Sequence, residues 1–280
     1  MKKIIALLFV LALSLTLLVG CGGSDESLSK VEQIKKDGKL VIYTNAEFPP
    51  FEYIAGGKPT GVDIDICQAI ADELGVKLEV KDVEFDSIVA SVKSGKADLG
   101  AAGITVTTER QEEVDFTISY TTSKQYVILP ESVEYKDITT LKNMKIGVQL
   151  GTTGDFVITD EINGYEGDDG EKVQGVLEGS GASVTQYPNA NVAAVQLTSG
   201  KIDAVVIDKL PAELIAKNNE GLKAYELVYE DGSNTEESYA ICVAKGNEDL
   251  VEVCNKVIQK LLDEGKIDEF IIKHSTEVSE

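Results

Sequence analysis

The sequence predicts an α/β protein built from two similar lobes that are joined by two extended, crossing segments. Short β-rich apolar runs alternate with helical runs, which is the rhythm of a largely parallel sheet covered by helices. The pattern then begins again, because KIGVQLGTTGD resembles KLVIYTNAEF in being a buried strand followed by a polar turn. The peptides SGKADLGAA and SGKIDAVVID occupy equivalent places in the two halves, because each follows a helix. We therefore expect two lobes of one design.

The first half contains three expected strands and two expected helices. The strands cover residues 39–43, 77–80 and 97–102, and a helix lies in each gap between them. In the first of these helices Ile66, Ile70 and Leu74 recur at helical spacing. Gly75 follows where a left-handed C-cap residue is wanted, so we expect the helix to end there.

The second half repeats the arrangement and adds the crossing segments. A strand is expected from residue 145, and a later helix begins near Asn189. Residues 125–130 and 238–244 are strand-like and would carry the chain between the lobes. We expect the first lobe to contain residues 36–123 and 239–280, and the second lobe to contain residues 124–238.

Two further segments complete the expected architecture. Leu250, Cys254, Val257 and Leu261 predict a C-terminal helix that ends at Gly265 and packs on the first lobe. The sole histidine, His274, is expected in a charged tail after it. Residues 162–175 are glycine-rich and acidic and are expected to form a solvated loop of unassigned function.

The N-terminus has the pattern of a secretory signal. Lys2 and Lys3 precede an apolar run that ends at Val19, too short and too asymmetric for a membrane span. Residues 18–21, LVGC, resemble the lipobox of bacterial lipoproteins, which implies an acylated Cys21 carrying palmitate-type chains as the mature N-terminus. We expect a signal peptide at 1–20 and a lipidated flexible tether at 21–35. The alternative is an uncleaved helix with an incidental cysteine.

Charge and cysteine content exclude several classes of function. Removing residues 1–20 takes away two lysines and no acid, so the formal net charge of -22 becomes -24. Such a surface repels nucleic acid and anionic headgroups, so no nucleic-acid partner is expected and the lipid on the tether would provide the membrane attachment. Cys67, Cys242 and Cys254 form no CxxC spacing and are expected as small core residues, although their redox state stays open.

The layout as a whole resembles a known family. TNAEFPPFEY, VDIDI, EFDSI, AAGITVTTER, VDFT, GVQLGTTGD and DAVVIDKLP occur in this order. The chain is thereby similar to the family 3 solute-binding proteins of polar amino-acid ABC importers over nearly its whole mature length. The resemblance implies a two-lobed, periplasmic-binding-protein-like (type II) clamshell with two crossing hinge strands.

Arg110 is the only arginine in the chain and lies in TTERQEE. Its planar guanidinium matches a carboxylate in bidentate fashion, as no lysine can. Thr108 and Gln111 have the form of a capping box, which places Arg110 in the first turn of a helix. An exposed arginine paired with nearby glutamates is the alternative. The resemblance implies that Arg110 clamps the α-carboxylate of a ligand, helped by the Thr105 hydroxyl and a closely approaching Gly103.

A ligand ammonium needs an acidic acceptor when it leaves water. Asp208 ends the strand IDAVVID, where open α/β sheets place ligand groups, and the resemblance assigns it to the α-ammonium. An acid at the start of the next helix is the competing reading. The resemblance also directs the backbone N–H of Thr153 to the carboxylate from the second lobe.

The remaining candidates concern the ligand side chain. Phe48 and Phe85 match the aromatic positions that sandwich it in the family, with core packing as the alternative for each. Asn45 stands where relatives that take basic ligands often carry aspartate, which favours an uncharged polar ligand such as glutamine. Gln149 would add to that polarity or face water.

We therefore expect an extracytoplasmic lipoprotein, anchored on the outer face of the cell membrane, that captures a free amino acid. It would deliver the ligand to an ABC permease and its ATPase, as a monomer without cofactor or metal. An enzyme is not expected, because no catalytic set is visible. A prephenate or arogenate (cyclohexadienyl) dehydratase on the same fold, with Glu47 or Lys124 as its acid, is one alternative. A ligand-sensing module is another.

Overall fold

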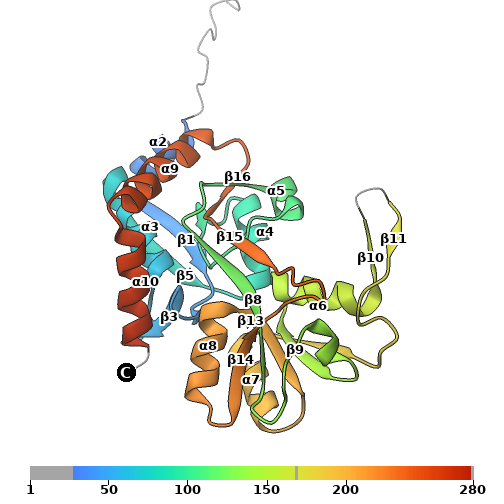
Figure 1. The fold of residues 1–280 in the computed structure, drawn as a ribbon. Coiled ribbons are helices and arrows are strands. Elements are labelled where there is room, and N and C mark those ends of the chain that lie inside the picture. The colour runs from blue at the N-terminus through green and yellow to red at the C-terminus, as the bar shows by residue number, and fades with distance from the viewer. Residues whose placement is uncertain (1–27, 168–169, 279–280) are drawn as a thin grey trace, which may run out of the picture.

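The structure, a computed structural model, describes residues 28–167 and 170–278. The predicted signal peptide and Cys21 lie outside the described residues. Figure 1 shows two α/β bodies joined by the extended strands β8 (Thr121–Pro130) and β15 (Glu236–Tyr239). The predicted two-lobed fold is confirmed. Among the described helices, none has the length and apolarity that a membrane span requires.

The first lobe contains a five-stranded sheet in the order β5-β1-β6-β16-β7. Strand β1 pairs in parallel with β5 and β6, whereas β16 runs antiparallel to β6 and β7. The late strand β16 thus returns the chain to the first lobe, as predicted. The bounds are β1 (Lys39–Thr44), β5 (Lys77–Asp82), β6 (Leu99–Gly100), β7 (Val114–Phe116) and β16 (Cys242–Ala244), with a small sheet of β2 (Glu47–Phe48), β3 (Glu52–Ala55) and β4 (Lys58–Thr60).

The second lobe repeats the plan with the order β12-β9-β13-β8-β14 and with β15 added along β8. Strands β9, β12 and β13 are mutually parallel where they pair, and β8 and β14 are antiparallel additions. Side chains of the central strands are buried on both faces, since helices cover both. The bounds are β9 (Lys145–Gln149), β12 (Ser183–Tyr187), β13 (Ala204–Asp208) and β14 (Leu222–Glu226).

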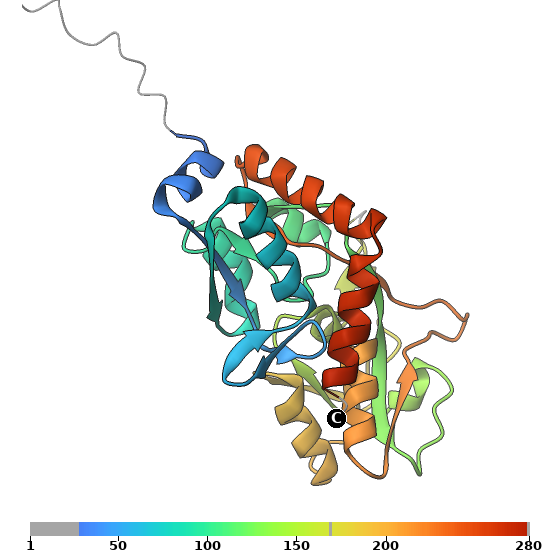
Figure 2. The same ribbon diagram turned by 90° about the vertical axis from the view of Figure 1, so that its left-hand side faces the viewer.

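Helices cover both sheets. In the first lobe α3 packs on β1 and β5, α9 and α10 pack on α3, and α4 packs against β1, β6 and β16 (Figure 2). In the second lobe α6 and α7 pack on β9, and α8 packs on β8 and β14. The helices are α2 (Lys30–Asp37), α3 (Val62–Leu74), α4 (Ile88–Lys93), α5 (Thr108–Glu113), α6 (Thr153–Asn163), α7 (Ala190–Thr198), α8 (Lys209–Asn218), α9 (Glu248–Asp263) and α10 (Lys266–Glu277), with short 3-10 turns η1 (Phe85–Ser87) and η2 (Ile138–Leu141).

Helix α2 corrects the predicted tether, because residues 30–35 are helical. Ser29 and Glu32 form a reciprocal capping box at its start. Ile34 is buried in the core, and the N–H of Val31 donates to Asp249 Oδ2 at 2.8 Å. The chain is therefore fixed to the first lobe from about residue 30 onward, and the predicted tether does not extend to residue 35.

Two other expectations are also corrected. His274 does not lie in a charged tail but is fully buried in α10, where its Nε2 is 3.0 Å from Asp65 Oδ2. The left-handed conformation of Gly265 turns the chain so that α10 can start directly after α9. Residues 162–175 are not simply a loop: β10 (Tyr165–Glu166) and β11 (Lys172–Val173) pair as an antiparallel hairpin that projects from the second lobe (Figure 1).

Candidate functional site

A narrow cavity lies between the ends of the two sheets. Every site residue predicted from the sequence lines it, with residues 45–110 coming from the first lobe and residues 149–208 from the second. Ala102 and Thr152 also line it and were missed, although each directly precedes a predicted residue. The lining residues are Asn45, Phe48, Phe85, Ala102, Gly103, Thr105, Arg110, Gln149, Thr152, Thr153 and Asp208.

Helix α5 places Arg110 in the cavity. The capping residue is Thr107, whose Oγ1 accepts a hydrogen bond from the Arg110 N–H at 3.2 Å. The sequence predicted Thr108 as the cap, one residue too late, because the extended backbone of Thr107 already brings its hydroxyl to the third helical amide. The side chain of Arg110 still leaves from the first turn of the helix, as predicted.

The guanidinium of Arg110 is buried, with 8% of the residue exposed. Its Nη1 donates to the carbonyl oxygen of Thr105 at 2.8 Å, and its Nη2 donates across the lobes to that of Gly151 at 3.0 Å. Its Cζ lies 5.5 Å from the centre of the Phe85 ring, within cation–π range. The alternative of an exposed surface arginine is therefore wrong. Burial lowers the pKa of Arg110, and the charge of Glu237 raises it again. Because the ordinary pKa of a guanidinium is very high, Arg110 stays cationic.

The hydroxyl of Thr105 has a hydrogen-bond direction that the sequence did not reveal. Its hydroxyl donates its single hydrogen to Glu237 Oε2 at 2.8 Å. Only the lone pairs of Thr105 Oγ1 therefore remain for a ligand, and they suit an ammonium rather than a carboxylate. This differs from the prediction that the hydroxyl helps Arg110 to hold the α-carboxylate.

Gly103 lies where the backbone approaches the cavity most closely. Its φ of +54° is in the left-handed region, and a Cβ there would be 2.8 Å from Phe48 Cε1. Its N–H donates to Asp63 Oδ2 at 2.8 Å. A side chain at this position would strain the backbone and push the Phe48 ring out of place.

Asp208 supplies the negative charge. It lies at the end of β13, is 5% exposed, and accepts a hydrogen bond from the Tyr239 hydroxyl at 2.5 Å. It makes no side-chain cap for α8, so the reading as a helix-capping acid is not supported. Burial, then the charge of Glu237, raises the pKa of Asp208 well above its ordinary value. An adjacent ligand ammonium would favour the ionised form.

The second lobe adds the start of helix α6. Thr152 caps this helix by accepting from the Asp155 N–H at 3.2 Å, so the helix begins at Thr153. First-turn amides of a helix have no intrahelical acceptor and favour an anion. This geometry suits the predicted contact between the Thr153 N–H and a carboxylate. Thr153 Oγ1 also accepts from Gln125 Nε2 at 3.3 Å.

Two amides and two aromatic rings form the other end of the cavity. Gln149 Nε2 donates to Asn45 Oδ1 at 2.9 Å, which joins the lobes, and Asn45 Nδ2 donates to the carbonyl of Val83 at 2.9 Å. Gln149 therefore faces the cavity rather than water. Phe48 is buried and its ring lies 5.8 Å from that of Phe51, whereas Phe85 is half-buried. Both aromatic residues thus pack and line the cavity at once.

Carboxylates gather beside this end. Burial raises the pKa of Glu47, and the neighbouring charges of Asp82 and Glu84 raise it further. Asp86 lies close to Gly151, with its Cβ 3.1 Å from where a Cβ of that glycine would stand. The negative potential of such a cluster attracts cations.

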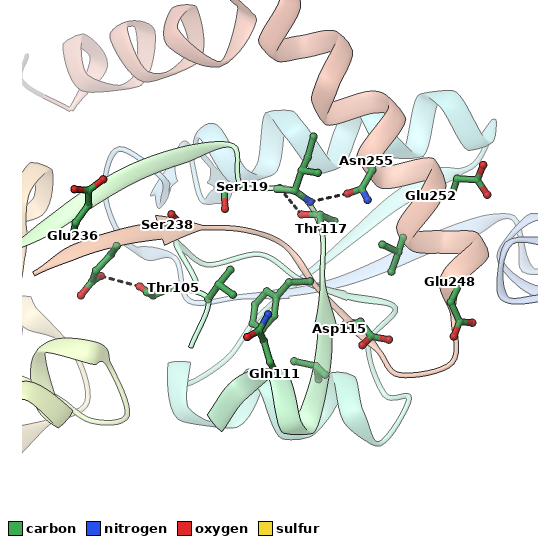
Figure 3. A pocket seen from close by; sticks show the side chains of 16 residues that line it. Thr105, Gln111, Asp115, Thr117, Ser119, Glu236, Ser238, Glu248, Glu252 and Asn255 are labelled. Atoms are coloured by element: carbon green, nitrogen blue, oxygen red, sulfur yellow. Dashed lines mark hydrogen bonds between the residues drawn. The ribbon is translucent and has the colours of Figure 1, made fainter. Parts of the chain in front are cut away.

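A wider and more open groove lies beside the first lobe, between α5, β7, α9 and β15 (Figure 3). It shares Thr105 with the interlobe cavity. Its ionisable lining residues are all acids, so it lacks the paired opposite charges that a zwitterion requires. These acids are Asp115, Glu236, Glu237, Glu248 and Glu252. We therefore place the candidate site in the smaller cavity.

The structure also places the groups that the sequence suggested for other chemistries. The described residues contain no group of His, Cys, Asp or Glu that could hold a metal ion. Cys67, Cys242 and Cys254 are buried free thiols, as expected for core residues. Neither candidate acid of a dehydratase lines the cavity: Glu47 lies outside it, and Lys124 Nζ pairs with Glu226 at 2.7 Å.

A cavity between two lobes, with opposite charges at fixed places, defines a clamshell binding protein for a small zwitterion. The chain belongs to the bacterial extracellular solute-binding proteins, family 3, which it matches over residues 40–277.

Individual relatives agree with this assignment. A probable histidine-binding protein of Neisseria gonorrhoeae is 31% identical, over 98% of this chain and 96% of its own. The solved structure of the amino-acid ABC transporter substrate-binding protein AbpA of Streptococcus pneumoniae, bound to L-arginine, has a TM-score of 0.78 at 34% identity, covering 89% of this chain and 99% of that one. An ancestral amino acid-binding protein described as a precursor of cyclohexadienyl dehydratase has a TM-score of 0.75 at 28% identity, covering 88% and 99%.

Proposed function

We propose that this protein captures a free amino acid between its two lobes and delivers it, unchanged, to the permease and ATPase of an ABC importer. The observation that carries the proposal is the placement of Arg110 and Asp208 in one interlobe cavity. The guanidinium matches an α-carboxylate, and the aspartate matches an α-ammonium. Nothing in this pairing requires chemical conversion of the ligand.

We further propose that the ligand side chain is cationic, with L-arginine as the first candidate. The carboxylates of Glu47, Asp82 and Glu84 lie close enough to influence one another beside the cavity, and a cation would relieve their repulsion. Gln149 donates to Asn45 Oδ1 and Asn45 donates to the carbonyl of Val83, so the remaining lone pairs of the two amide oxygens can accept from N–H donors of a ligand. L-Glutamine, favoured from the sequence because Asn45 is neutral, has the donors without the charge.

Calorimetric titration with L-arginine, L-lysine, L-histidine, L-glutamine and L-cystine tests both statements. We expect saturable binding of at least one of them, with L-arginine tighter than L-glutamine. Chromatography of the ligand recovered after long incubation should return it unchanged. Conversion would favour the dehydratase-type alternative, and no binding at millimolar concentration would contradict the proposed function.

The predicted lobe boundaries become part of this proposal. Residues 36–123 with 239–280, and residues 124–238, would move as rigid bodies about the crossing strands and close on the ligand. X-ray scattering should show a smaller radius of gyration with ligand than without it. An unchanged radius at saturation would contradict a closing motion. A single monomeric mass in the same sample would support action as a monomer.

Membrane attachment rests on Cys21, which lies outside the described residues. The lipobox-like LVGC supports acylation of this cysteine on the extracytoplasmic face, and two or more acyl chains give stable anchoring. In a bacterial host, the wild type should partition into detergent and Cys21→Ala should stay in the aqueous phase. Identical partitioning of the two would refute the anchor.

A further inference from the structure

Glu237 is a buried carboxylate on the hinge strand β15 that the sequence analysis did not single out. We infer that it is a positioning residue for ligand binding, which acts through Gln125 and two threonines that line the cavity. This inference rests on the proposed function, because it concerns how the same cavity is prepared for an amino acid.

The geometry is a continuous hydrogen-bonded path across the hinge. Glu237 Oε2 accepts from the Thr105 hydroxyl at 2.8 Å on the side of the first lobe (Figure 3). Glu237 Oε1 accepts from Gln125 Nε2 at 3.0 Å, and Nε2 also donates to Thr153 Oγ1 at 3.3 Å in the second lobe. Glu237, which also lines the open groove, is only 7% exposed, and Gln125 is fully buried.

This path gives each threonine hydroxyl a defined polarity. A carboxylate can only accept hydrogen bonds, so the Thr105 hydroxyl donates its hydrogen to Glu237. Only its lone pairs then remain for a group in the cavity. Gln125 donates both amide hydrogens, so Thr153 accepts from it and keeps its own hydrogen free. Thr105 therefore suits the ammonium of an amino acid, and Thr153 suits its carboxylate.

The orientation of the Gln125 amide follows from its surroundings. Turning it over would place its oxygen against Glu237 Oε1, two acceptors facing each other. In the observed orientation Gln125 Oε1 is buried without a hydrogen-bond partner among the described residues. It lies where a Cβ of Gly154 would be only 2.6 Å away, so the glycine makes room for it. A buried acceptor left unpaired indicates that the two donated bonds decide the orientation.

The two path residues also belong to the strands that must bend during lobe movement. Strands β8 and β15 are antiparallel, with Glu237 opposite Ser123 and Glu236 opposite Lys124. Glu237 and Gln125 are absent from the cavity lining and have no direct access to the ligand. Part of their effect on affinity therefore passes through Thr105 and Thr153, beside the direct influence of the Glu237 charge on Asp208.

The test is calorimetric titration of L-arginine and L-glutamine into the wild type, Glu237→Gln, Thr105→Val and the double variant. Glu237→Gln keeps the shape but sets an amide against two donors, and we expect binding to weaken about 10- to 100-fold. In the Thr105→Val background the same substitution should change affinity much less, because part of its route to the ligand is gone. Glu236→Gln, the exposed neighbour, should bind within about twofold of the wild type.

Wild-type affinity in Glu237→Gln, or losses that simply add in the double variant, would overturn the inference. A wild type that binds neither amino acid would instead count against the proposed function. Thermal unfolding without ligand reports whether each variant is folded. If Glu237→Gln is not, Gln125→Met removes the next link of the path, and unchanged affinity in that variant would equally refute the role.

Discussion

Replacing Arg110 by lysine keeps the positive charge but changes the geometry of the charged group. In the structure the guanidinium donates from two nitrogens, to the carbonyls of Thr105 at 2.8 Å and Gly151 at 3.0 Å, while its Cζ lies 5.5 Å from the centre of the Phe85 ring. A lysine ammonium is a compact group on a flexible stem and lacks the fixed fork. The variant therefore retains the cation but loses the paired geometry that a carboxylate requires.

The size of the effect follows from the bonds at stake. A hydrogen bond to a charged group contributes about 1.5–3 kcal/mol, so losing one arm of the fork should weaken ligand binding roughly 10- to 150-fold. Because Arg110 is only 8% exposed and also joins the lobes, the variant should also unfold more readily without ligand, by on the order of 1 kcal/mol.

Calorimetric titration of Arg110→Lys with the tightest amino acid of the screen measures the first effect, and thermal unfolding measures the second. Glu109→Gln is the matched control, since it removes a charge from the exposed side of the same helical turn. It should change affinity by less than about twofold. Near wild-type affinity in Arg110→Lys would refute the assignment of Arg110 as the carboxylate fork.

Three further outcomes follow from the site and its supports. Asp208→Asn should weaken binding by at least tenfold in calorimetry, because the ligand ammonium loses its charged partner, and an unchanged affinity would remove Asp208 from the site. Gly103→Ala should lower the free energy of unfolding by about 1 kcal/mol or more and should weaken binding, because of the φ of +54° and the 2.8 Å approach to Phe48. An unchanged free energy of unfolding in urea would contradict the predicted strain. Burial raises the pKa of Asp63 to about 6, although hydrogen bonds from Tyr120 and Gly103 act to lower it. The stability that the protonated Asp63 contributes is therefore complete below about pH 3.8 and is lost as the pH rises through about 6. Relative to the wild type, Asp63→Asn should therefore be more stable at pH 7 than at pH 4 by roughly 2 kcal/mol, and a change of the opposite sign in urea titrations would refute this.

The sequence by itself determined the two-lobed α/β plan and the residues that line the cavity. The plan depends on local signals: strand and helix periodicities specify the elements, and glycine at position 75 ends α3 where predicted. The cavity residues could be predicted because the motifs that contain them, such as AAGITVTTER, resemble those of a known family. Arg110 stood out as the only arginine.

The tertiary structure alone decided which of these groups are paired and which face a ligand. Thr105 and Glu237 are 132 residues apart, and Gln125 and Glu237 are 112 apart, so no periodicity or motif brings them together. The same holds for His274, which is buried because α10 packs on α3 and sets it against Asp65. Hydrogen-bond polarity depends on these long-range partners, because a hydroxyl can donate its hydrogen only once. The sequence therefore identifies Thr105 as a site residue, and only the fold shows that its hydroxyl is left as an acceptor for a ligand.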